Sequence, residues 1–250
     1  MTHTEYPPLN AWQVAVRLVG GCLLLALGLC LIGWSIVKLT PESWTTAESH
    51  VNEWFVDHRT AALDVATRIG SGFSDTVTCV AVLIVTVILM RLWLGRWRES
   101  WAVTAAIVGE LLVFLIVTAL VGRDRPNVDQ LDLAPPTSSF PSGHTAAAVA
   151  LYGCIAIIVL RELRLRWLAV LIAVVCWIIP VAVGLSRIYR GMHFPSDVLF
   201  GAIGGALWLT IVVTTLLSLR RMASGDRPPT LPDRWSANSA ARLRPNVRST

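Results

Sequence analysis

The chain carries little charge for its length and almost no lysine. Of its 250 residues, 15% are charged and 54% are hydrophobic, and Lys38 is the single lysine beside twenty arginines. A soluble domain of this length normally carries more charge, so the composition excludes an ordinary soluble protein and indicates the membrane class. The net charge of +5 requires no nucleic-acid partner, because arginines beside anionic lipid account for it.

Cysteine is also scarce, and its positions indicate no chemistry. All five cysteines lie inside apolar runs, without metal-ligand spacing and without pairing across a loop. We therefore expect them to be small packing residues rather than a metal site or a disulfide framework. The chain shows no internal repeat and no second folded domain.

Long apolar runs are what the sequence has in abundance. Most of the six approach the ~20 residues that a bilayer core requires. The first is too long for the apolar part of a signal peptide and lacks a clear cleavage site, so we expect it to be retained. The sequence thus predicts an all-α membrane protein, a bundle of six transmembrane helices. The expected spans are Leu18–Val37, Asp75–Leu94, Trp101–Leu120, Thr145–Leu160, Trp167–Leu185 and Val198–Leu219.

The segments around the spans complete the expected organisation. We expect a cytoplasmic N-terminal lead at 1–17, one six-span domain at 18–219 and a disordered basic tail at 220–250. Between Pro41 and Gly72, apolar residues such as Val51 and Trp54 recur at helical spacing with charged residues between them. This pattern predicts an amphipathic helix on the outer face, either purely structural or bordering the path by which a lipid reaches the site.

The arginines predict the orientation. With both termini cytoplasmic, fourteen arginines lie on cytoplasmic segments, and six arginines with Lys38 lie on outer ones. This bias agrees with the positive-inside rule. We therefore expect a multi-pass protein of the cell membrane.

Three short polar segments lie at ends of apolar runs. They are Arg125-Pro126, Pro141-Ser142-Gly143-His144, and Ser186-Arg187 followed by His193 and Asp197. The parity of six spans brings all three to one face, which is extracytoplasmic in the expected orientation. A helix that opens at Ser142 and Gly143 favours a bound phosphate, and arginine grips phosphoryl oxygens through two donors.

The two histidines and the aspartate supply the chemistry. One imidazole can attack phosphorus while the other protonates the leaving oxygen. Asp197, four residues after His193, can orient that imidazole, can cap the last helix, or can do both.

These segments resemble the motifs of the type 2 phosphatidic acid phosphatase family, the lipid phosphate phosphatases. That family carries Lys-x6-Arg-Pro, Pro-Ser-Gly-His and Ser-Arg-x5-His-x3-Asp, and the last two are complete here. The resemblance implies that His193 forms a phosphohistidine, His144 is the general acid and Asp197 orients His193. It also implies that Arg125, Ser142, Gly143 and Arg187 hold the phosphate, with no metal and no other cofactor. A vanadium haloperoxidase, which shares the helical core, is disfavoured because that branch is typically soluble and larger.

The first motif departs from the family pattern. Thr118 stands where the family has lysine. Arg123, two residues before Arg125, is the charge that we expect to replace it in binding the phosphate.

Glu110 is an unusual residue near the middle of the third run. A carboxylate within the membrane is a candidate functional group. A structural role, in which the carboxyl is protonated or hydrogen-bonded to a Trp or Thr on a neighbouring helix, is slightly favoured.

The sequence therefore predicts a metal-independent membrane hydrolase acting on a lipid phosphate or diphosphate. An outward site and an arginine-rich, lysine-poor composition favour a polyprenyl diphosphate of the undecaprenyl or decaprenyl type. Phosphatidate or phosphatidylglycerol phosphate comes second. A lipid phosphotransferase and a weakly catalytic lipid-binding or transport protein remain as alternatives.

Overall fold

The computed structural model describes residues 10–217, and within that range the chain is helical, without strands. The tail expected at 220–250 and the first nine residues of the expected lead lie outside the described residues. Two shorter helices, α2 (Glu42–Asp57) and α3 (Ala61–Gly72), connect the first long helix to the second. The long helices are α1 (Ala11–Leu39), α4 (Thr76–Leu94), α5 (Arg98–Val121), α6 (Gly143–Glu162), α7 (Arg166–Tyr189) and α8 (Pro195–Val212), which a π-helical turn, η1 (Val213–Leu217), extends.

The prediction of six membrane helices is confirmed. Each long helix, with η1 counted as part of α8, is long and apolar enough to cross a membrane. Helix α1 begins earlier than the apolar run because Asn10 and Gln13 form a reciprocal cap. The Asn10 side chain accepts the Gln13 N–H at 2.8 Å, and the Gln13 side chain accepts the Asn10 N–H at 3.0 Å.

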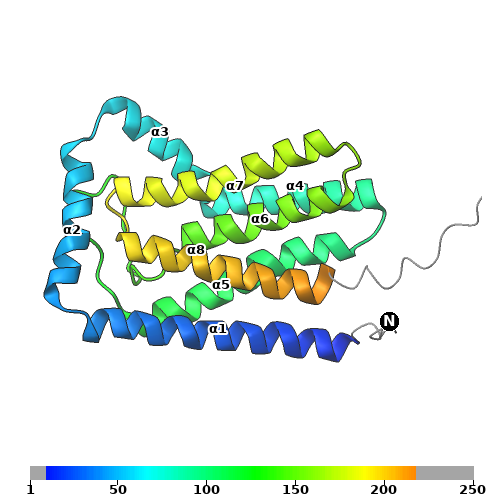
Figure 1. Cartoon of the computed structure of the whole chain (residues 1–250), viewed down its shortest axis with the longest axis horizontal. Helices are drawn as coiled ribbons and strands as arrows, with labels where there is room; N and C mark the ends of the chain where they lie inside the picture. The colour runs from blue at the N-terminus through cyan, green and yellow to red at the C-terminus, as the bar shows by residue number, and fades with distance from the viewer. Residues whose placement is uncertain (1–9, 218–250) are drawn as a thin grey trace, which may run out of the picture. The chain divides into compact units, whose positions relative to one another are not determined.

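The connection between α1 and α4 forms two helices. Thr60 begins α3 as its N-cap, because its hydroxyl accepts the Leu63 N–H at 3.3 Å. Just before it, the Arg59 side chain is held by the Asp129 carboxylate at 3.1 Å. The chain therefore turns at 58–60, so that α2 and α3 take different directions (Figure 1).

Helix α6 is the centre of the bundle. Of its most apolar stretch, 67% is buried, a larger share than in any other described span, and it packs against α5, α7 and α8. Gly201 lets α8 approach the start of α6, because a Cβ there would lie 2.5 Å from the Ser142 carbonyl oxygen. The close packing at this end brings the segment after α7 against the segment before α6.

The site lies at one end of the bundle. Helices α1, α5 and α7 finish there, and α4, α6 and α8 begin there. In Figure 1, α2 runs across this end of the long helices. The loop at 122–142, between α5 and α6, belongs to the same end, so all three motif segments meet as the parity of the spans predicts.

Candidate active site

His193 lies in the short loop between α7 and α8, and its side chain is almost fully buried. Its Nδ1 lies 2.8 Å from the carbonyl oxygen of Ser139. A carbonyl can only accept, so Nδ1 carries the ring proton and Nε2 keeps a lone pair. Burial, the largest effect, lowers the pKa of His193; Asp197 opposes this shift in part, and the nearby arginines add to it. The imidazole is therefore neutral and nucleophilic near pH 7.

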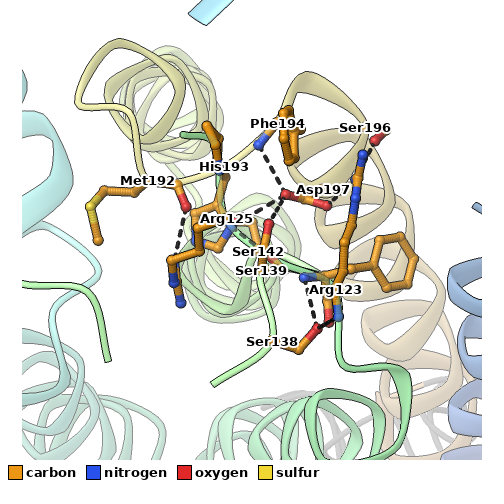
Figure 2. A network of polar contacts seen from close by, with 12 residues as sticks. Arg123, Arg125, Ser138, Ser139, Ser142, Met192, His193, Phe194, Ser196 and Asp197 are labelled. Atoms are coloured by element: carbon orange, nitrogen blue, oxygen red, sulfur yellow. Dashed lines mark hydrogen bonds and ion pairs between the residues drawn. The ribbon is translucent and has the colours of Figure 1, made fainter. Parts of the chain in front are cut away.

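Asp197 is fully buried and does not hydrogen-bond to His193 directly. Its Oδ2 lies 3.8 Å from the His193 Nδ1, beyond hydrogen-bond distance. The same carboxylate accepts the Ser139 hydroxyl and the Phe194 backbone N–H, the latter at 2.9 Å (Figure 2). In this structure Asp197 therefore lies at ion-pair distance from His193 without a direct hydrogen bond, and its hydrogen bonds position His193 indirectly. Asp197 accepts a hydrogen bond from the Ser139 hydroxyl, and the Ser139 carbonyl accepts the N–H of the His193 ring. Asp197 thus positions His193 through Ser139.

Arg123 lies on the far side of Asp197 from His193 (Figure 2). Its guanidinium donates to the Asp197 carboxylate at 2.5 Å, to the Ser196 hydroxyl at 2.8 Å and to the Glu48 carboxylate at 2.6 Å. The side chain is buried and is not part of the cavity wall described below. The structure therefore places Arg123 behind the histidine, as the partner of two carboxylates, and not at the expected phosphate position.

Helix α2 supplies two buried polar residues that sequence analysis missed. Glu48 accepts the Ser196 backbone N–H at 2.8 Å in addition to Arg123. Asn52, one turn later, donates to the carbonyl oxygens of His193 at 3.1 Å and Ile188 at 3.3 Å. The apolar residues Val51 and Trp54 are exposed instead. The spacing of four residues between Glu48 and Asn52 places both on one face of the helix and could have predicted this polar face. The apolar residues of the same segment indicated only the opposite face.

Arg125 and Arg187 line a common cavity. Arg125 donates to the Met192 carbonyl at 2.8 Å, and Arg187 donates to the Ser71 hydroxyl at 2.9 Å. In both side chains the buried Nε–H finds no hydrogen-bond partner among residues 10–217. Burial lowers the pKa of Arg125, although guanidinium remains charged at any ordinary pH. Two cations with unused donors give this part of the cavity the chemistry that suits an anion.

Asp132 joins the arginines at the cavity wall. Its carboxylate accepts from Arg190 at 2.5 Å and from Arg187 at 3.0 Å. The hydrogen bond from Arg190, the largest effect, holds the pKa of Asp132 below its usual range. Asp132 therefore stays ionised and fixes the direction of both guanidinium groups. Sequence analysis missed it because a lone aspartate in a loop carries no motif.

His144 opens α6 on the cavity wall. Its Nε2 lies 3.2 Å from the carboxylate of Asp75, the N-cap residue of α4. Both side chains are partly exposed, so the pair can exchange a proton with a bound molecule. Asp75 is a third carboxylate that sequence analysis missed, and it lies 69 residues from His144 along the chain.

Ser142 and Gly143 take different positions at the start of α6. Ser142 is fully buried, its hydroxyl is paired with the Thr145 hydroxyl at 3.0 Å, and it is not part of the cavity wall. Gly143 does line the cavity, and a Cβ there would lie 2.7 Å from the Phe114 ring. The first helical hydrogen bond is donated by Ala146 to Ser142. The N–H groups that precede it, at Gly143 and His144, are available to an anion.

The cavity has a volume of about 650 Å³ and two chemically different parts. We call the polar part, with both histidines and the arginines, the mouth. We call the deeper part, between α4, α5 and α6, the floor. The residues of the floor are Cys79, Val80, Ile107, Glu110, Leu111, Phe114 and Ala147. Among residues 10–217, no three His, Cys, Asp or Glu side chains are grouped so as to hold a metal ion.

Comparison with known proteins identifies the family. Residues 99–221 match the PAP2 superfamily. Decaprenylphosphoryl-5-phosphoribose phosphatase of Mycobacterium tuberculosis (strain H37Rv) is 37% identical over 145 residues, which cover 53% of this chain and 68% of the relative. Phosphatidylglycerophosphatase B of Bacillus subtilis (strain 168) is 31% identical over 120 residues, 46% of this chain. The match spans only 59% of that relative's own length.

A solved structure shares the fold. The crystal structure of a transmembrane PAP2 type phosphatidylglycerolphosphate phosphatase from Bacillus subtilis superposes with a TM-score of 0.68 at 20% identity. The superposition covers 86% of this chain and 100% of the other. The sequence match to the mycobacterial relative, the motif residues and the shared fold agree. This multi-pass membrane protein belongs to the PAP2 superfamily.

Proposed function

We propose that the protein is a membrane phosphatase that removes phosphate from a lipid through a phosphohistidine on His193. The observation that carries this proposal is the hydrogen bond from the His193 Nδ1 to Ser139. It leaves a neutral Nε2 on the wall of a cavity that also holds Arg125, Arg187 and His144. A nucleophile, two anion-binding cations and a proton donor are what phosphoryl transfer from a lipid requires.

The proposed reaction has two steps. In the first, the His193 Nε2 forms a bond to phosphorus while the bond from phosphorus to the lipid oxygen breaks. His144 gives its proton to that oxygen. In the second, water attacks the phosphohistidine, His144 takes a proton from it, and inorganic phosphate leaves with His193 restored.

The remaining site residues bind or position. Arg125, Arg187 and the first N–H groups of α6, including that of Gly143, hold the phosphoryl oxygens. Ser142 fixes the start of α6 through its buried hydroxyl. Asp197 acts through Ser139 on the nucleophile. None of these roles needs a metal ion, so the proposal includes metal-independent turnover that persists in EDTA.

The experiment is phosphate release by the purified protein, with detection of the phosphoenzyme. Wild type should release inorganic phosphate and give a phosphoenzyme that survives alkali and is lost in acid, as a phosphohistidine is. His193→Ala should give neither, and His144→Ala should be slow with poor leaving groups. Full activity in His193→Ala contradicts the mechanism. Transfer to an added lipid alcohol in place of water would make the protein a phosphotransferase, and the absence of turnover in wild type would leave a lipid-binding protein.

The proposed lipid is a polyprenyl chain that carries the phosphate in a head group or as a diphosphate. The mycobacterial relative is named for a decaprenyl lipid, and the apolar floor continues the cavity into the bundle. Phosphatidylglycerol phosphate or phosphatidate is the second candidate, supported by the name of the Bacillus subtilis relative. Comparing kcat/KM for a polyprenyl diphosphate, decaprenylphosphoryl-5-phosphoribose and phosphatidate in one detergent tests this order. A tenfold preference for phosphatidate would reject the polyprenyl class.

A further inference from the structure

Glu110 lies on the floor of the cavity, below the proposed phosphate site. It stands one helical turn before Phe114 on α5, nearer the middle of the helix. Phe114 in turn packs against Gly143, where α6 begins. Glu110 is therefore about 6 Å further along the helix from the mouth than Phe114 is. Its side chain is 6% exposed, yet it forms part of the cavity wall.

The Glu110 carboxyl has no protein partner. Among residues 10–217 no hydrogen bond or ion pair to it is formed. The indole of Trp208, which packs beside Gly109, donates to the carbonyl oxygens of Ala105 at 3.1 Å and Ala106 at 3.0 Å. The Trp208 indole is therefore not a hydrogen-bond partner of Glu110. Buried polar groups are normally paired, so a nearly buried carboxyl on a cavity wall without a protein partner is a candidate for pairing with a bound molecule or with water.

The chemistry of the floor restricts that ligand. Around Glu110 the wall consists of Val80, Ile107, Leu111, Phe114 and Ala147 with the Cys79 thiol, and no arginine or histidine of the mouth belongs to it. A plain hydrocarbon at this depth would leave the carboxyl unsatisfied. A second phosphate would bring an anion to a carboxyl without a cation beside it. A hydroxyl satisfies the carboxyl in either protonation state, because it can both donate and accept.

We propose that Glu110 forms a subsite for a hydroxyl-bearing segment, such as a sugar or glycerol unit, between the scissile phosphate and the lipid chain. This inference rests on the proposed phosphatase function and narrows its substrate. Within the polyprenyl class it favours a phosphorylated sugar or polyol head group over a plain polyprenyl diphosphate. Glu110 here determines specificity and takes no part in the bond-breaking step.

A hydroxyl moved along a simple substrate tests the subsite. The probes are hexadecyl phosphate and a series of hexadecyl phosphates that carry one hydroxyl at carbons 2 to 8. Purified full-length protein should show a maximum in kcat/KM at one or two neighbouring positions. The expected gain over hexadecyl phosphate is about tenfold, which corresponds to about 1.4 kcal/mol.

Variants assign the maximum to the carboxyl. Glu110→Leu should flatten the profile, so that the ratio of the best hydroxylated probe to hexadecyl phosphate falls from about ten toward one. Glu110→Gln, which keeps a donor and an acceptor, should keep part of the ratio. Leu112→Ala is the matched control on the exposed side of the same helix and should keep all of it.

The outcomes separate this inference from the proposed function. If wild type releases phosphate from every probe with a flat profile, the subsite is refuted and the phosphatase stands. A maximum that survives in Glu110→Leu also refutes it. If wild type hydrolyses no probe and no lipid phosphate, the phosphatase function itself fails. Should Glu110→Leu not fold, the wild-type profile and Glu110→Gln still decide.

Discussion

Replacing Glu48 with glutamine tests whether α2 holds the nucleophile in place. The carboxylate accepts from Arg123 at 2.6 Å and from the Ser196 N–H at 2.8 Å, and Glu48 is only 7% exposed. Glu48→Gln keeps the shape but removes the charge that pairs with Arg123. Hydrogen bonds to charged groups contribute about 1.5–3 kcal/mol each. If half of the free energy of one such hydrogen bond no longer serves to position Asp197 and Ser139, kcat should fall roughly fourfold to tenfold.

The assay compares kcat, KM and the thermal unfolding midpoint in detergent. Because Glu48 does not line the cavity, KM should stay within about twofold while kcat falls. The unfolding midpoint should fall by a few degrees, on the order of 2–4 °C per kcal/mol for a chain of this size. Glu53→Gln, the same change on the exposed side of α2, is the control. If Glu48→Gln matches Glu53→Gln in kcat, helix α2 does not position the nucleophile and the reasoning is refuted.

Three further predictions concern pH, the phosphate charge and the topology. Burial lowers the pKa of His193, so protonation of His193 should reduce kcat/KM only below about pH 6.5, once the substrate's own ionisation is accounted for. A fall in kcat/KM above that pH that is traced to His193 would contradict the buried position of its imidazole. Arg68 lies at the cavity mouth, so Arg68→Ala should raise KM, whereas Arg123→Ala should mainly lower kcat and stability. If Arg123→Ala instead raises KM and Arg68→Ala does not, Arg123 rather than Arg68 binds the phosphate. In a cysteine-free background, Gln130→Cys should react with an impermeant reagent from outside intact cells and Trp97→Cys should not, and the opposite pattern would invert the proposed orientation.

The spans and the convergence of the motifs were predictable because both depend on local sequence. A run of apolar residues defines a membrane helix without reference to other helices. The parity of the spans then places Arg125, the start of α6 and the loop with His193 at one end. The pairing of hydrogen-bond donors with acceptors within the site was not predictable from the sequence. It depends on which side chain reaches a given acceptor first once the helices are packed.

The Asp197 and His193 pair illustrates the difference. A spacing of four residues allows a direct contact, but the Ser139 carbonyl lies nearer to the ring nitrogen, at 2.8 Å against 3.8 Å. Ser139 is 54 residues away from His193 in the chain, and Glu48 is 75 residues away from Arg123. Such contacts arise from helix packing over long separations. A sequence pattern specifies the residue types of the site, and packing decides which pairs form.

The ion pairs of Arg123 also bear on which residue supplies the positive charge of the lysine that is absent at Thr118. Arg123 stands between the buried carboxylates of Glu48 and Asp197 and forms an ion pair with each. Moving the guanidinium to a phosphate would leave both carboxylates buried without a cation, which is strongly unfavourable. Arg123 therefore cannot substitute for the lysine absent at Thr118. Arg68 of α3 is exposed, lines the cavity and has no ion-pair partner among residues 10–217. It can turn toward a bound phosphate without disturbing any buried pair, and this makes α3, together with the motif helices, a source of the positive charge at the mouth.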